Sequence, residues 1–142
     1  MKNNIILIQF IAFAILLHSC TSGKNIRKNN PDHVWTFTYL KAQENQKTNL
    51  KIYIEKNWFA MDHTAVKQGL LGQYELYENK DPGNKDWDFI VAVEYLTTKG
   101  YDDIATEFEA IRSRHQIIKI NGLDMKGLGK VVKSETLSKK RY

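Results

Sequence analysis

The sequence has a single cysteine, Cys20, which excludes a framework of internal disulfides and a zinc site built from several cysteines. It has only two prolines and eight glycines, too few for a collagen-like or proline-rich chain. Apolar residues make up 42% and charged residues 26% of the 142 residues, a mixture typical of one globular domain rather than a disordered chain. The net charge of +5 comes from cations scattered along the chain, so we expect no nucleic-acid partner.

The chain has one long apolar run, over residues 5–17, which is interrupted only by Gln9. A helix needs about 20 apolar residues to cross the hydrocarbon core of a membrane, and this run is shorter. A cation at Lys2, an apolar core of this length and small residues after it are typical of a secretory signal peptide. We therefore expect residues 1–19 to be a signal; the alternative is a buried N-terminal helix.

The end of this run resembles the lipobox of bacterial lipoproteins. Leu17 lies three residues before Cys20 and the small Ser19 just before it, whereas His18 departs from the usual pattern. The resemblance implies that Cys20 carries a diacylglyceryl group, so that membrane lipid is a partner; the alternative is an ordinary signal with a coincidental cysteine. Residues 20–32 are polar and would form a lipidated tether. We expect an exported protein on the non-cytoplasmic side, with the choice between inner and outer membrane open.

Residues 33–142 alternate between the periodicities of strands and helices, and we expect them to form one α+β domain. Strands are predicted over 33–41, 70–78, 87–96 and 130–138, helices over 48–68 and 101–111, and a short helix within 115–129. Gly69 is placed where a helix-ending glycine would stand. The order strand, helix, strand, strand, helix, strand predicts a ferredoxin-like βαββαβ fold, a four-stranded antiparallel sheet with two main helices on one face.

Apolar side chains should occupy both faces of that sheet. Alternation predicts Trp87, Phe89 and Val91 on one face of the third strand, with Ile90 and Ala92 on the other. Two helices can cover only one face, and a large apolar face in contact with water indicates an interaction site. We therefore expect a homodimer formed by two sheets packed face to face.

At the level of fold the domain resembles the dimeric α+β barrel superfamily, which includes antibiotic-biosynthesis-monooxygenase-like and stress-responsive barrel proteins. The resemblance covers about residues 33–138. It is carried by the opening strand VWTFTYLK, by the helix with Trp58 and His63 that runs into KQGLLGQYELY, and by the strand DFIVAVEYL. It implies a dimer in which the ligand lies between the first helix and the sheet. The family contains cofactor-free oxygenases, isomerases and many members without demonstrated activity, so it does not fix the function.

The sequence contains no nucleophile elbow, phosphate-binding loop or paired metal ligands, so we expect no cofactor and no metal. His63 and Glu94 are the candidate catalytic groups. Histidine titrates near neutrality, and a carboxylate in an otherwise apolar strand must be solvated, paired with a cation or functional. In a ligand site, His63 would supply a polar contact, Trp58 and Trp87 the apolar walls, and Tyr74 or Glu94 a second hydrogen-bonding group. The alternatives are an exposed His63, an ion-paired Glu94 and purely structural aromatics. Two functions stay open: a module that dimerises and binds a small apolar molecule, or a cofactor-free monooxygenase-like enzyme.

Overall fold

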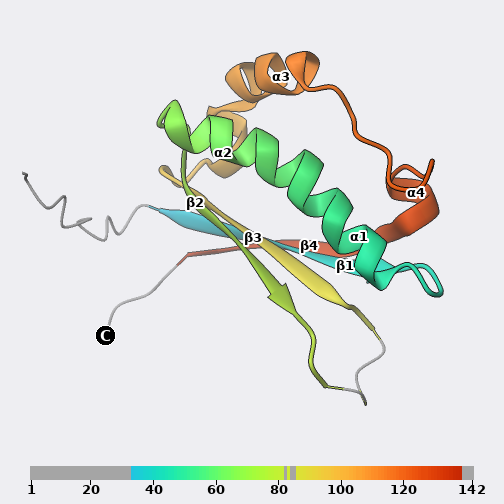
Figure 1. Ribbon diagram of the computed structural model, residues 1–142. Coiled ribbons are helices and arrows are strands. Elements are labelled where there is room, and N and C mark those ends of the chain that lie inside the picture. The colour runs from blue at the N-terminus through green and yellow to red at the C-terminus, as the bar shows by residue number, and fades with distance from the viewer. Residues whose placement is uncertain (1–32, 82, 84–85, 139–142) are drawn as a thin grey trace, which may run out of the picture.

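The computed structural model describes residues 33–81, 83 and 86–138; the predicted signal, Cys20 and tether lie outside them. Its core is one antiparallel sheet with strand order β2-β3-β1-β4 and with the helices on one face (Figure 1). The strands are β1 (Val34–Ala42), β2 (Leu71–Glu78), β3 (Phe89–Tyr95) and β4 (Gly129–Ser138). The helices are α1 (Lys47–Tyr53), α2 (Phe59–Lys67), α3 (Ala105–Arg114) and α4 (Met125–Leu128), with a π-helical turn η1 (Ile54–Trp58) and a 3-10 turn η2 (Gly100–Asp103).

This topology is the ferredoxin-like fold, and it confirms the fold class predicted from the sequence. β1 is a central strand that pairs antiparallel with both β3 and β4, and β2 pairs with the other edge of β3. β1 and β3, which are the two central strands, have the clearest alternation of apolar side chains in the sequence. The strands differ from the predicted ones only at their ends, whereas the predicted helix over 101–111 is a 3-10 turn, η2, followed by α3.

The first predicted helix is one continuous helical segment, Lys47 to Lys67, made of α1, η1 and α2. Its middle turn is wider than an α-helical turn, because η1 has π-helical hydrogen bonding over five residues. The segment ends as predicted at Gly69, whose φ of +74° lies in the left-handed region that glycine adopts without strain.

The core between helices and sheet contains two clusters of buried side chains. One includes Leu40, Leu50, Ile54, Phe89 and Leu128, and the other includes Met61, Ala65, Leu71, Phe108 and Ile111. The first cluster is so close-packed that a Cβ atom on Gly129 would stand 2.7 Å from the Lys41 carbonyl oxygen and 2.8 Å from a Leu50 methyl group. Glycine is thus required at this position by the close approach of backbone and side chain.

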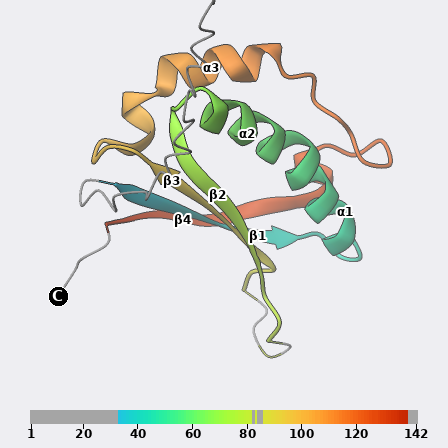
Figure 2. The ribbon, with the colours of Figure 1, turned by 60° about the vertical axis from the view of Figure 1, so that its left-hand side comes forward.

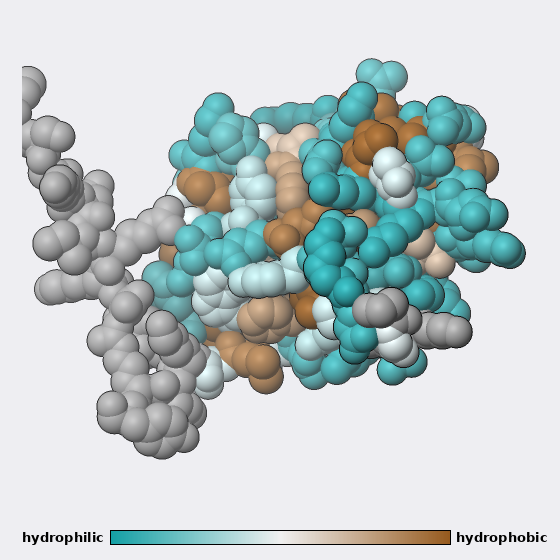
Figure 3. All heavy atoms as spheres, turned by 60° about the horizontal axis from the view of Figure 1, so that its bottom comes forward, coloured by the Kyte–Doolittle hydropathy of each residue, from teal (hydrophilic) through white to brown (hydrophobic). Residues whose placement is uncertain are grey.

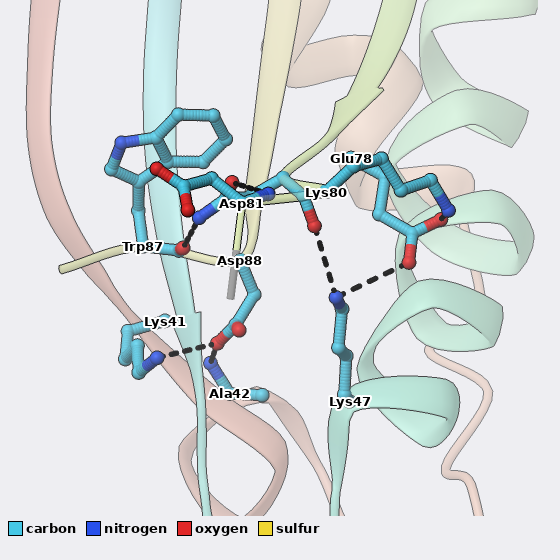
Figure 4. Close-up of polar contacts among 9 residues, drawn as sticks. Lys41, Ala42, Lys47, Glu78, Lys80, Asp81, Trp87 and Asp88 are labelled. Atoms are coloured by element: carbon cyan, nitrogen blue, oxygen red, sulfur yellow. Dashed lines mark hydrogen bonds and ion pairs between the residues drawn. The ribbon is translucent and has the colours of Figure 1, made fainter. Parts of the chain in front are cut away.

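Polar contacts fix the end of the sheet where β2 and β3 are joined (Figure 4). Lys47 from α1 forms an ion pair of 3.2 Å with Glu78 and donates a hydrogen bond of 3.3 Å to the carbonyl oxygen of Asn79. Asp88 accepts a hydrogen bond from the backbone N–H of Ala42 at 2.9 Å and forms a 3.2 Å ion pair with Lys41. These contacts tie the β2–β3 connection both to the first helix and to the neighbouring strand.

No described helix covers the opposite face of the sheet, which we call the open face (Figure 2). On β1, Val34 and Leu40 are buried under the helices, so Trp35, Phe37 and Tyr39 lie on the open face. Viewed from that side, brown and white surface lies among teal surface (Figure 3). A shallow hollow of about 340 Å³ is lined there by Trp35, Phe37, Tyr77, Leu137 and Ser138.

The structure corrects the expected position of Trp87. β3 begins at Phe89, so the alternation of that strand does not extend back to Trp87. Instead the Trp87 ring packs edge to face against Tyr39, with ring centroids 5.7 Å apart. The Tyr39 hydroxyl donates a 2.7 Å hydrogen bond to Glu135 on β4, which lies on the same side of the sheet.

Candidate functional site

A cavity of about 430 Å³ lies between the sheet, the second half of the long helical segment, and α3. Its size is within the usual range of small-molecule sites. The surrounding side chains are mainly aliphatic and aromatic and come from β1, β3, η1, α2, η2, α3 and the segment after α3: Thr38, Trp58, Met61, Asp62, Val91, Val93, Tyr95, Tyr101, Phe108, Arg112 and Ile117. Figure 2 shows α2 and α3 side by side above the strands that form the cavity floor.

The helical segment presents three residues to the cavity at helical spacing. Trp58 ends the π-helical turn, and Met61 and Asp62 follow it by three and four residues. Positions with these separations lie on the same face of a helix, so one stretch of chain supplies an aromatic wall, a thioether and a carboxyl group.

Asn57, the residue before Trp58, holds the segment after α3 against the π-helical turn. Its side chain is fully buried, and its amide donates to the carbonyl oxygens of Tyr53 and Ile118 at 3.0 Å each. Its Oδ1 atom accepts from the Ile118 backbone N–H at 2.8 Å and lies 3.1 Å from Nε2 of His115. All four hydrogen-bonding positions of the amide are thus used, and the neighbouring Ile117 is held at the cavity wall.

Asp62 is the exceptional group of the site. It is only 6% exposed, yet no hydrogen bond or ion pair joins its carboxyl group to any residue that the structure describes. Burial away from water raises its pKa from 3.8 to about 7. Tyr95 lines the same cavity. Burial raises the pKa of Tyr95 to about 12, with further contributions from the Asp62 charge and from Tyr101, so the Tyr95 hydroxyl is neutral at pH 7.

The charged side chain of Arg112 already has a partner of its own. Its guanidinium donates a 2.6 Å hydrogen bond to Glu109, which also accepts a 2.9 Å hydrogen bond from the Tyr101 hydroxyl. The guanidinium carbon lies 5.7 Å from the centroid of the Phe108 ring. This group therefore closes one side of the cavity without neutralising Asp62.

Of the site residues proposed from the sequence, Trp58 lines the cavity and His63 does not. The helix turns by about 100° from one residue to the next, so His63 points away from the cavity that Asp62 faces, and its side chain is exposed. Tyr74 packs its ring against Phe59, with centroids 4.7 Å apart, and is not part of the cavity lining.

The other two residues proposed from the sequence lie away from the cavity. Glu94 stands on the open face, where Oε1 is 3.1 Å from Nδ1 of His33. Trp87 packs against Tyr39 as described above. Glu94 is thus on the other side of the sheet from His63, and no hydrogen bond or ion pair joins His63 to Tyr74 among the described residues.

Asp62 is not among the residues proposed from the sequence, whereas its neighbour His63 is. A usable signal was present: Asp62 follows Trp58 by four residues, next to a stripe of apolar positions, where a carboxyl group would be buried with them. Within the described part of the chain, no three acidic, histidine or cysteine side chains are grouped so that they could hold a metal ion. The same part contains no helix long and apolar enough to cross a membrane.

Comparison with known proteins relates the chain to others by fold only. No family model and no curated protein matches it. Among solved structures it is similar to a dimeric protein of unknown function with a ferredoxin-like fold from Bacteroides fragilis NCTC 9343, with 11% identity, a TM-score of 0.43, and coverage of 77% of this chain and 96% of that one. It is also similar to a structure described as a chlorite dismutase, with 9% identity and a TM-score of 0.43, covering 74% of this chain and 42% of that one. At these identities and TM-scores the similarity carries no information on ligand or reaction.

Proposed function

We propose that this chain is an exported lipoprotein, anchored to a membrane through Cys20, whose α+β domain pairs with a second copy and binds a small, largely apolar molecule. The cavity between the helices and the sheet is the observation that carries the binding role. It has the size of a ligand site, mainly apolar walls, and a few polar groups that could orient a ligand, among them the Asp62 carboxyl and the Tyr95 hydroxyl. The lipidated anchor is supported by the sequence from Lys2 to Cys20.

Mass spectrometry of the protein purified from membranes tests the proposal. Under denaturing conditions, we expect a chain that begins at Cys20 and carries the mass of a diacylglyceryl group. Under native conditions, we expect an additional small molecule that is released on unfolding, because the walls of the cavity come from several elements that only the folded chain brings together.

The control is Cys20→Ser, which should accumulate as an unprocessed precursor without incorporated palmitate, because a hydroxyl cannot replace the acceptor thiol. Normal processing of this variant would contradict the lipoprotein proposal. Absence of any bound molecule from several native preparations would contradict the proposed binding role.

The dimer is supported by the composition of the open face. Trp35 and Phe37 stack there with ring centroids 6.1 Å apart, and Tyr77 and Leu137 are 47% and 52% exposed in the single chain. Ile90 lies between them, paired with Tyr39 on one side and Tyr77 on the other. Polar pairs such as His33–Glu94 and Lys133–Glu135 stand around this patch. An apolar centre with a polar rim is the usual anatomy of a protein interface.

Replacing Ile90 with aspartate should abolish the dimer and leave the fold intact, because Ile90 is on the open face whereas Val91 is in the core. In a twofold interface the substitution is present twice, so it should weaken the free energy of dimerisation by roughly 3 kcal/mol or more. The dissociation constant of the dimer should then rise at least about a hundredfold. Analytical ultracentrifugation of the chain from residue 33 onward measures this.

Ile118→Asp is the matched control, because Ile118 is exposed on the helical side of the molecule and should tolerate the charge without affecting the dimer. If the unsubstituted chain is monomeric at micromolar concentration, the dimer proposal fails.

A cofactor-free enzyme of the monooxygenase-like type is the second candidate, and Asp62 is the observation that favours it. A carboxyl group with a pKa of about 7 inside a cavity can accept a proton from a bound substrate near neutral pH. His63 and Glu94 would not take part directly, since neither lines the cavity. Conversion of the molecule found by native mass spectrometry, lost in Asp62→Asn, would favour this candidate over simple binding.

A further inference from the structure

We infer that the ligand of this cavity is a small amine, protonated at neutral pH and attached to an apolar or aromatic body, and that Asp62 binds its ammonium group. The inference rests on the proposed function, because it requires that the cavity hold a ligand. It adds the chemical class of that ligand and the residue that recognises it.

The first observation is the missing partner of Asp62. Proteins pair a buried carboxylate with a cation or saturate it with hydrogen bonds, because an unpaired buried charge is strongly unfavourable. At Asp62, which is 6% exposed and lines the cavity, no described residue supplies either. A ligand with a cationic N–H group would supply both the charge and the hydrogen bond.

The second observation is the aromatic lining that surrounds this carboxyl group. Trp58, Tyr95, Tyr101 and Phe108 contribute rings from four different elements. Aromatic faces attract cations, and desolvated sites strengthen this attraction. Phe108 already has the Arg112 guanidinium 5.7 Å from its centroid, which shows that a cation is accommodated beside this wall.

The charged and titratable groups around Asp62 leave room for one more positive charge. Tyr95 faces the cavity from β3 and Tyr101 from η2, and the pKa of each is raised, so both are neutral at pH 8. From α3, the Arg112 charge is compensated by Glu109 at 2.6 Å. Among the described groups that line the cavity, Asp62 alone carries a charge without a partner at pH 8.

This arrangement makes amine binding dependent on pH. Burial raises the Asp62 pKa to about 7, so the group is mostly protonated at pH 6 and mostly a carboxylate at pH 8. An amine that stays protonated over this range should therefore bind about tenfold more tightly at pH 8 than at pH 6. A neutral ligand of the same shape should not show this gain.

The test is calorimetric titration of the full chain in a nonionic detergent with 2-phenylethylamine and with 2-phenylethanol, which differ in charge but hardly in shape. At pH 8 we expect the amine to bind about tenfold or more tightly than the alcohol, because a charge-assisted hydrogen bond is roughly twice as strong as a neutral one. Asp62→Asn should remove this preference and leave the alcohol affinity unchanged. Asp102→Asn, which removes an exposed carboxyl group outside the cavity, is the matched control and should retain the preference.

The possible results distinguish failure of the amine inference from failure of the proposed binding role. Equal affinity for amine and alcohol, or an amine preference that survives Asp62→Asn, overturns the inference while the cavity remains a ligand site. Failure of both molecules to bind overturns the proposed binding role and the inference with it. A preference for the amine that disappears at pH 6 and in Asp62→Asn supports both.

Discussion

Replacing Asn57 with alanine is expected to lower the free energy of unfolding by about 3–4 kcal/mol, since it leaves several buried polar groups without partners. The substitution removes the amide donor to the carbonyl oxygens of Tyr53 and Ile118, and with it the oxygen that faces the Ile118 N–H and the His115 ring. Asn57 is fully buried, so water cannot replace these hydrogen bonds without opening the packing around the π-helical turn. Urea denaturation at constant pH measures the loss, and the amide proton of Ile118 should exchange faster with solvent.

Asn49→Ala is the matched control, because Asn49 stands in the same helical segment but is only half-buried. Its contacts are a 2.8 Å hydrogen bond to Gln46 and a 3.4 Å contact with Asn121, and its loss should cost less than about 0.5 kcal/mol. Asn57→Asp should be at least as harmful as the alanine change, because an oxygen would then face the carbonyl oxygens of Tyr53 and Ile118. A loss below about 1 kcal/mol in Asn57→Ala would contradict this account of how the segment is held.

Asp62→Asn is expected to stabilise the folded protein at pH 8, by roughly 2–4 kcal/mol, although it removes the proposed binding group. In the unfolded chain the carboxyl group ionises near its ordinary pKa of 3.8, whereas burial raises the pKa in the folded state to about 7. Between these values the folded state keeps a proton that the unfolded state releases. The contribution of Asp62 to stability therefore falls as the pH rises from about 4 to about 7, and it stays at its low value above that range.

The measurement is the difference in unfolding free energy between Asp62→Asn and the unsubstituted chain, from urea denaturation at several pH values between 4 and 8. This difference should be near zero at pH 4 and should reach its full value above pH 7. The other titratable groups are the same in both proteins, so their contributions cancel in the difference. Asp102→Asn, which removes an exposed carboxyl group outside the cavity, is the matched control. A flat difference for Asp62→Asn would show that the Asp62 carboxyl group is solvated in the folded state.

The architecture of the domain could be predicted from the sequence because its signals are local. Alternation in β1 and β3, the apolar stripe from Leu50 to Ala65 and the helix-ending Gly69 each depend on residues close together in the chain. The prediction was wrong for Trp87, where the same alternation was extended beyond the beginning of β3. β3 begins just after a bend at Asp88, and periodicity does not reveal that bend.

The cavity residues were harder to predict, because their roles depend on contacts between distant parts of the chain. In the sequence Asn57 is indistinguishable from an ordinary polar helix residue. Its role becomes evident only from its contacts with residues 115–118, and Ile118 lies 61 residues further along the chain. Asp62 and His63 are adjacent in sequence, and only the packing of α3 and β3 shows that Asp62 is the buried one. The sequence favours His63 because an ordinary histidine titrates near neutrality. In the structure, burial raises the pKa of the neighbouring Asp62 carboxyl group to about 7, which is in that same range.

The π-helical turn sets the angular phase of everything that follows it in the long helical segment. Each residue of an α-helix rotates the chain by about 100°, and each residue of the wider π-helical turn rotates it by less. If Ile54–Trp58 took regular α-helical geometry without a change in chain length, α2 would therefore turn about its axis relative to α1, and Met61 and Asp62 would leave the cavity. Deleting one residue of the turn would instead remove the residue that the wide turn accommodates, and α2 would nearly keep its orientation. The composition of the site thus depends on the geometry of a single turn, which accommodates one extra residue while the cavity residues of α2 stay in phase with the apolar stripe of α1.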